Sequence, residues 1–236
     1  MRSDPHLQPA YVIHARPYRE TSLLLEVLTP ESGRLGVVAR GVRRPKSALK
    51  PLLQPFRPLL MAWRGRGALV TLTGAESAGA AVALRGRSLW NGLYVNELVQ
   101  RLLPRHDSHP PLFAAYGQTL QELAAAHGKD REEPVLRYFE RDLLDAIGYG
   151  LVLDRETDTG EVIDAQTRYF YRLDHGPTGE DDGYSPRIRG AALKALVHSQ
   201  LHDPESLREV KRLMRTALAL HLGPRPLRSR ELFSRL

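Results

Sequence analysis

Apolar positions in the first 80 residues occur in short runs separated by turn-rich pieces. Five of these runs have the length and composition of β-strands, namely 10–16, 21–29, 33–41, 58–65 and 67–76. The pieces between them, such as TPESG and WRGRG, favour turns. Five strands in about 75 residues fit a small barrel of the oligonucleotide/oligosaccharide-binding (OB) type, a fold that commonly presents an open face to oligonucleotides.

From residue 85 the apolar positions recur with the spacing of a helix. The pattern predicts helices over 88–103, 111–128, 132–150 and 189–201, and a last helix that follows Asp203 as its N-cap and stops at Gly223. Between these helices, the acidic and turn-rich stretch contains a single predicted strand, 167–173. We therefore predict an α+β protein with an N-terminal five-stranded OB-fold β-barrel at 1–80. A mainly α-helical domain would follow at 81–236, with an irregular acidic insertion at about 150–188.

Positive charge is concentrated in particular segments of the chain. The 34 Lys and Arg exceed the 27 Asp and Glu, and the net charge is +7 at residues 1–80, −5 at 81–203 and +5 at 204–236. Between Glu31 and Glu76 there is no acid but there are nine bases. Such a field of one sign favours a polyanionic partner, although a solvated Arg-rich surface remains an alternative.

Two features refine the picture of a nucleic-acid surface. A second basic patch lies on the outer face of the last helix and comprises Arg208, Lys211, Arg212 and Arg215. Base stacking would require aromatic side chains, for which the barrel offers Tyr11, Tyr18, Phe56 and Trp63. A core position is the favoured interpretation of Phe56 and Trp63, so we expect contacts to phosphate to dominate and sequence selectivity to be weak.

Motifs of catalysis and of metal binding are weak in this sequence. No Gly-rich phosphate loop or dinucleotide fingerprint occurs, and the pairs His106/His109 and His198/His202 lack an obvious third ligand. Four acids could in principle hold Mg²⁺ for a nuclease, but their scatter favours a solvated loop; these are Asp154, Glu156, Asp158 and Asp164. We predict that the protein is not an enzyme and has no cofactor. No apolar run has the length of a membrane span and the first residues lack the apolar core of a signal peptide, so we expect a cytoplasmic protein.

Several longer segments resemble, in order along nearly the whole chain, the RecO family of bacterial recombination mediators, particularly its cysteine-free proteobacterial branch. The segments are YVIHARPYRETSLLLEVLTPESGRLGVVARGVRR, LQPFRPLL, LTGAE, LYVNEL, RYFERDLLDAIGYG and KRLMRTALALHLGPRPLRSRELF. The resemblance implies an OB fold followed by a helical domain. It also implies binding of single- and double-stranded DNA, annealing of complementary strands and, with RecR, loading of RecA onto DNA coated by single-strand-binding protein. The partners implied are DNA, RecR and the acidic, aromatic-ended C-terminal tail of the single-strand-binding protein, and the location implied is the nucleoid.

The resemblance also suggests site residues. The family's DNA contacts map onto basic positions of the barrel, which here are Arg34, Arg40, Arg43, Arg44, Lys46, Lys50, Arg57 and Arg66. A pocket for the partner's tail needs an apolar slot and a base. Helix 132–148 is the candidate for one wall, with Lys194 or Arg212 as a further base and with Leu136, Arg137, Phe139 and Arg141 on the helix.

One departure from the family is the absence of cysteine, since many members carry a four-cysteine zinc site in the middle region. Segment 154–186 must therefore be held by packing or stay loose. The alternative function, from another class, is an OB-fold adaptor that docks acidic protein tails without significant direct binding of DNA. A metal-dependent nuclease, the third possibility, would cleave DNA on addition of Mg²⁺.

Overall fold

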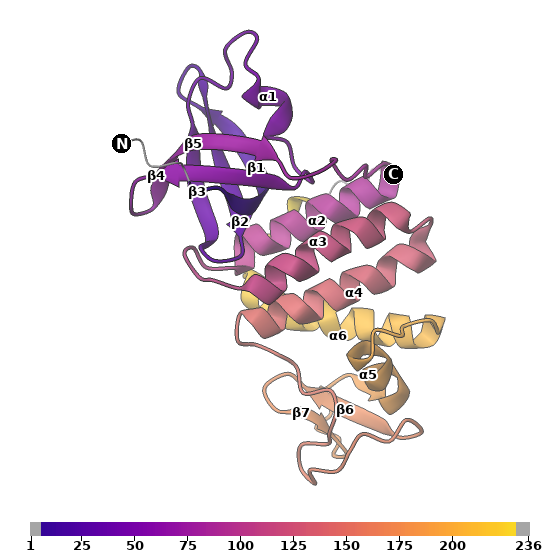
Figure 1. Cartoon of the computed structure of the whole chain (residues 1–236). Coiled ribbons are helices and arrows are strands. Elements are labelled where there is room, and N and C mark those ends of the chain that lie inside the picture. Colours follow the sequence, from indigo (N-terminus) through magenta and orange to yellow (C-terminus); the bar gives the residue numbers. More distant parts are fainter. Residues whose placement is uncertain (1–5, 230–236) are drawn as a thin grey trace. The chain divides into compact units, whose positions relative to one another are not determined.

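Figure 1 shows the computed structural model of the chain, which describes residues 6–229. These residues form two compact units. The first comprises the described residues up to Ala125 together with 227–229, and the second comprises Ala126–Pro226. Two helices that the sequence pattern assigns to the helical domain share the first unit with the barrel, and the predicted domain boundary near residue 80 stays a prediction.

The first unit is built on a closed barrel of five strands in the order β1-β2-β3-β5-β4, with β4 pairing back to β1. All neighbouring strands are antiparallel except β3 and β5. This topology confirms the predicted OB-fold barrel. The strands are β1 (Gln8–Tyr18), β2 (Ser22–Thr29), β3 (Gly33–Ala39), β4 (Leu59–Arg64) and β5 (Leu69–Ser77).

Alternation along the strands supplies the barrel core. On β3, Leu35, Val37 and Ala39 point inward and are buried, and they pack with apolar residues of the other four strands. The connection from β3 to β4 contains one short helix, α1 (Leu49–Leu52), which the sequence pattern did not predict. In this connection Phe56 is only 6% exposed, so its interpretation as a core residue is confirmed.

Two helices complete the first unit, α2 (Gly86–Leu102) and α3 (Pro110–Ala125). The loop between them lies against the β2–β3 turn, where a Cβ on Gly33 would stand only 1.8 Å from the carbonyl oxygen of Asp107. Glycine is thus required by this close approach as well as by its φ of +62°. The hydroxyl of Ser108 donates to the carbonyl oxygen of Pro30 (3.0 Å), which fixes the same contact.

The second unit combines helices with a small sheet. The helices are α4 (Lys129–Ala146), α5 (Gly190–Val197) and α6 (Pro204–Leu222). The strand predicted at 167–173 is not alone: β6 (Arg168–Arg172) pairs on one edge with β7 (Gly176–Thr178) and on the other with β8 (Arg187–Arg189). Short strands of three residues have no detectable periodicity, which explains why the sequence pattern did not reveal the partners.

The acidic insertion is ordered by its own carboxylates. Glu156 accepts a hydrogen bond from the backbone N–H of Gly179 (2.8 Å), and Asp164 accepts from the backbone N–H of Gln166 (3.2 Å). Asp158 accepts from the hydroxyl of Thr178 and contacts the ring of His175, and these hydrogen bonds lower the pKa of Asp158. Three of the four acids that the sequence pattern left in a solvated loop therefore hold turns together.

Within residues 6–229, no three His, Asp or Glu side chains stand close enough together to share a metal ion. None of the described helices combines the length and the apolar content needed to cross a bilayer.

Candidate nucleic-acid interface

A cleft of about 460 Å³ opens at one end of the barrel. It lies between the β1–β2 turn, the end of β3 with the loop that follows, and the start of β5. Its lining residues are mostly cationic or hydroxyl-bearing: Tyr18, Arg19, Thr21, Ser22, Val38, Arg40, Gly41, Arg44 and Thr71. Cations and hydroxyl groups are the side chains that contact phosphate and sugar in nucleic-acid complexes.

Strand register brings these side chains onto one face. Val38 of β3 pairs with Leu24 of β2 and with Thr71 of β5, and Thr71 in turn pairs with Arg64 of β4. Directly opposed residues project to the same side of a sheet, so this row faces outward while the neighbouring row fills the core. Arg40 directly follows the last residue of β3 and lines the same cleft.

Backbone hydrogen bonds tie the loop after β3 to the β1–β2 turn. The N–H of Arg43 donates to the carbonyl oxygen of Thr21 (2.9 Å), and its guanidinium donates to the carbonyl oxygen of Arg19 (3.3 Å). The N–H of Arg44 donates to the carbonyl oxygen of Gly41 (3.1 Å). The guanidinium of Arg43 therefore helps to hold this loop against the β1–β2 turn, whereas the side chain of Arg44 lines the cleft.

The cleft carries uncompensated positive charge. Among the described residues, no carboxylate pairs with the guanidinium of Arg19, Arg40 or Arg44, and all three side chains are exposed. The guanidinium carbon of Arg19 lies 5.3 Å from the centre of the Tyr18 ring, a cation–π contact that positions both side chains at the rim. An anion is the ligand that this arrangement favours.

Arg34 has a different role from the one expected. Its guanidinium pairs with Glu26 (2.8 Å) and donates to the carbonyl oxygen of Leu103 (2.9 Å), and only 14% of its side chain is exposed. Arg105 also pairs with Glu26. This cluster attaches the α2–α3 loop to the outer face of the barrel, which removes Arg34 from the accessible cations.

Four of the other predicted cations do not line the cleft. Lys46 and Lys50 are exposed in the β3–β4 connection, and Arg66 is exposed in the β4–β5 turn. The guanidinium of Arg57 donates to the hydroxyl of Ser77 (3.4 Å), six residues along β5 from Thr71 and therefore about 20 Å from the cleft. The structure therefore does not bring the eight candidate bases together, because Arg34 and Arg57 lie away from the cleft, and their contacts with DNA stay a prediction.

Arg19 is a lining residue that sequence reasoning missed. It lies outside the acid-free span that begins after Glu31, and Glu20 is adjacent to it. The signal that could have identified it is topological, because the β1–β2 turn of an OB barrel is one of the loops that commonly contact oligonucleotides.

The second basic patch is only partly available. Lys211 pairs with Glu133 (2.9 Å), and the guanidinium of Arg212 donates to the carbonyl oxygen of Arg187 (2.5 Å). Arg208 and Arg215 are exposed. The four bases therefore do not act as one free surface.

The residues predicted for the partner-tail pocket are mainly interior. Leu136, Arg137 and Phe139 are 6%, 5% and 1% exposed, so they leave no accessible wall. Arg141 donates to the carbonyl oxygens of Leu196 (2.5 Å) and Val197 (3.2 Å), which caps the end of α5. Lys194 is half-exposed on α5. The burial and contacts of these residues therefore give no support to a tail-binding pocket on this helix.

Comparison with known proteins adds independent evidence. Residues 1–81 match the family model described as recombination protein O N terminal, and residues 87–231 match recombination protein O C terminal. The DNA repair protein RecO of Nitrosococcus oceani is 51% identical over 232 residues, which cover 98% of this chain and 93% of the relative. Those of Methylococcus capsulatus and Dechloromonas aromatica are 48% and 42% identical, over 98% and 100% of this chain and 96% and 98% of the relatives.

Proposed function

Because this chain belongs to the RecO family of DNA repair proteins, we propose that it is a recombination mediator that binds single- and double-stranded DNA and anneals complementary strands. With RecR it would help to load RecA onto DNA coated by single-strand-binding protein. The observation that carries the DNA-binding part is the cleft at the end of the barrel, where Arg19, Arg40 and Arg44 have no carboxylate partner among the described residues.

The cleft would hold the sugar-phosphate backbone. Guanidinium groups of Arg40 and Arg44 are suited to phosphate oxygens, because their N–H donors form charge-assisted pairs with them. The hydroxyls of Thr21, Ser22 and Thr71 could donate to the same strand. None of these contacts reads a base edge, so affinity would depend little on sequence.

Annealing in this proposal needs no chemical step by the protein. Cationic side chains neutralise part of the phosphate charge and thereby reduce the repulsion between two strands. Base pairing between complementary strands then supplies the free energy. Contact with the tail of the single-strand-binding protein would keep the mediator near the strand that is being released, at a high effective concentration.

The first test is single-strand binding by fluorescence anisotropy, for two oligonucleotides of unrelated sequence across a salt series. If about four to six phosphates are neutralised, log affinity falls against log salt with a slope of about −3 to −4, nearly equal for both sequences. The oligonucleotides should be recovered intact after incubation with Mg²⁺. Absence of binding at low salt would contradict the proposal and favour the adaptor, in which the basic cleft binds an acidic protein segment.

A further inference from the structure

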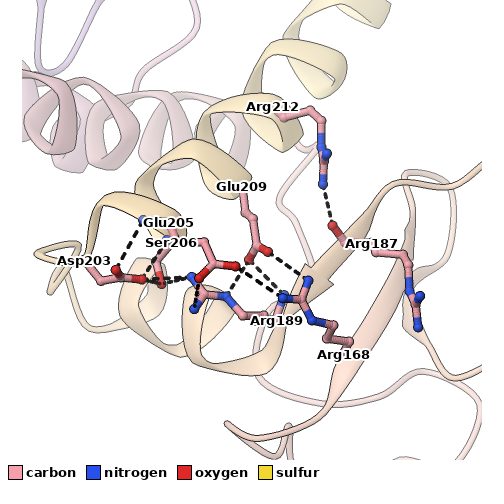
Figure 2. A network of polar contacts seen from close by, with 8 residues as sticks. All are labelled: Arg168, Arg187, Arg189, Asp203, Glu205, Ser206, Glu209 and Arg212. Carbon is pink, nitrogen blue, oxygen red and sulfur yellow. Dashed lines mark hydrogen bonds and ion pairs between the residues drawn. The ribbon is translucent and has the colours of Figure 1, made fainter.

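A second cleft, of about 590 Å³, lies within the second unit between the small sheet and α6. Its six lining residues are all Arg or Glu: Arg168, Arg187, Glu205, Arg208, Glu209 and Arg212. Figure 2 shows most of these side chains together with Arg189, Asp203 and Ser206, which continue the polar network along the start of α6.

Arg168 of the lining and Arg189 of the adjoining network form ion pairs with carboxylates. Arg189 pairs with Asp203 (2.8 Å), Glu205 (3.0 Å) and Glu209 (3.2 Å), and its backbone N–H also donates to Glu209. Arg168 pairs with Glu205 (3.2 Å) and Glu209 (3.4 Å). These ion pairs join β6 and β8 to α6, and they neutralise the acids that line the cleft.

The other three arginines of the lining have no carboxylate partner within residues 6–229. Among the described residues, no carboxylate lies within ion-pair distance of Arg187, Arg208 or Arg212. The guanidinium carbon of Arg187 lies 5.0 Å from the centre of the Phe170 ring, and its carbonyl oxygen accepts from Arg212. These contacts restrain two of the three arginines before any ligand arrives.

Two of these arginines stand close together on one helix. Arg208 and Arg212 are four residues apart on α6, so they face the same side of the helix and their like charges repel. The surrounding unit is acidic, with 15 Lys and Arg against 18 Asp and Glu in residues 126–226. A local excess of arginine on an acidic unit points to an anionic ligand.

The composition of the lining selects among anions. An acidic peptide with aromatic or apolar side chains would need an apolar slot, and none of the six lining residues is apolar. A phosphodiester backbone needs only guanidinium forks, and unstacked bases can lie against guanidinium planes. We propose that this cleft binds the backbone of a nucleic-acid strand independently of the barrel, as a second DNA site. The inference rests on the proposed function, since this cleft would hold a second strand on a protein whose barrel holds the first.

The test measures simultaneous binding of two strands to the full-length protein. Two short, non-complementary DNA oligonucleotides carry a donor and an acceptor fluorophore, and energy transfer reports their presence on one protein. The variant Arg187→Gln/Arg208→Gln should need about tenfold more protein than the wild type to reach the same energy transfer. Its affinity for one oligonucleotide alone, measured by anisotropy, should change by less than about twofold.

A matched control removes the same charge elsewhere on the unit. Arg155 and Arg172 are exposed, and within residues 6–229 their ion pairs are with Asp154 (3.4 Å) and Asp174 (3.9 Å), so Arg155→Gln/Arg172→Gln tests net charge without touching the cleft. Circular dichroism and the unfolding midpoint verify that all variants are folded. We expect the control to retain the energy transfer of the wild type.

Each remaining outcome has a defined meaning. Equal energy transfer in the cleft variant and the wild type would overturn the second site, as would an equal loss in the control. If the wild type binds one strand but never two, the second site is wrong and the proposed function stands. If the wild type binds no strand at all, both fall. An oligoglutamate peptide that binds the wild type but not the cleft variant, with energy transfer unaffected, would assign the cleft to an acidic protein segment.

Discussion

Arginines line a cleft in each of the two units, but only the cleft of the second unit also has carboxylates in its lining. At the end of the barrel, Arg19, Arg40 and Arg44 stand among hydroxyl groups, with no carboxylate in the lining. In the second unit, Arg168 and Arg189 are interleaved with Glu205 and Glu209. The number of arginines is therefore a poor guide to binding, and the carboxylates around them decide between structural and ligand-binding roles.

The same contrast occurs between the two ends of one strand. Arg34 is the second residue of β3, and Arg40 directly follows its last residue, Ala39. Arg34 meets Glu26 and becomes part of the structure, whereas Arg40 meets the β1–β2 turn and stays available. Variants at these two positions provide the most direct test of the comparison.

The largest effect is expected at the barrel cleft. Arg40→Glu/Arg44→Glu should weaken single-strand binding by about 100-fold, or about 2.7 kcal/mol, because two phosphate contacts become repulsive. The loss should be equal for unrelated sequences and the salt dependence should become shallower, as measured by anisotropy. A control, Arg85→Glu/Arg155→Glu, changes the net charge equally at exposed positions outside the cleft. Equal weakening by the control would show that overall charge, and not the cleft, governs binding.

The next largest effect concerns stability of the second unit. Arg189→Ala should lower the free energy of unfolding by about 2 kcal/mol, because Glu209, whose side chain is only 11% exposed, loses a close partner. Arg168→Ala should cost less than about 1 kcal/mol, since 48% of that side chain is exposed and its pairs are longer. Urea denaturation measures both. Equal costs would contradict the ranking by burial.

A smaller effect separates Arg34 and Arg40, at the two ends of β3. Arg34→Ala should lower the free energy of unfolding by about 1–2 kcal/mol through loss of its contacts with Glu26 and Leu103. Arg40→Ala should change stability by less than about 0.5 kcal/mol and weaken DNA binding by about tenfold. Denaturation and anisotropy on the same preparations measure the stability and the DNA affinity of each variant. An Arg34→Ala variant with wild-type stability and reduced DNA binding would show that Arg34 serves DNA binding and not stability.

The smallest effect is expected at the rim. Tyr18→Ala should weaken single-strand binding by about threefold and leave double-strand binding unchanged, because only an unstacked base can lie on the ring. The effect stays small since Arg19 already contacts the ring. Tyr18→Phe retains the ring and should behave as the wild type. If double-strand binding falls equally, Tyr18 shapes the turn and does not stack on bases.

Much of the fold was predictable because its signals are local. Alternation identified all five barrel strands, and helical spacing identified the five long helices within a few residues. The N-cap of α6 is confirmed, since Asp203 accepts hydrogen bonds from the backbone N–H groups of Glu205 and Ser206. The features missed are α1, β7 and β8, which are only three or four residues long and carry no periodicity.

The sites were less predictable, because they depend on residues distant in sequence. Arg34 lies 69 residues from Leu103, whose carbonyl oxygen it contacts. The carboxylates that occupy Arg168 lie 37 and 41 residues away on α6. Composition identified the barrel as basic, but it could not show that Arg19 joins the cleft from another strand end.

The sequence by itself determined the strands, the helices, the segregation of charge and the family, because each of these is carried by residue types and by their order. Only the tertiary structure decided which cations are free. An ion pair forms only where the two charged groups come within about 4 Å, and strand register and helix packing decide which carboxylate comes that close to a given arginine. The same residue type thus becomes a structural ion pair at Arg34 and a binding group at Arg40.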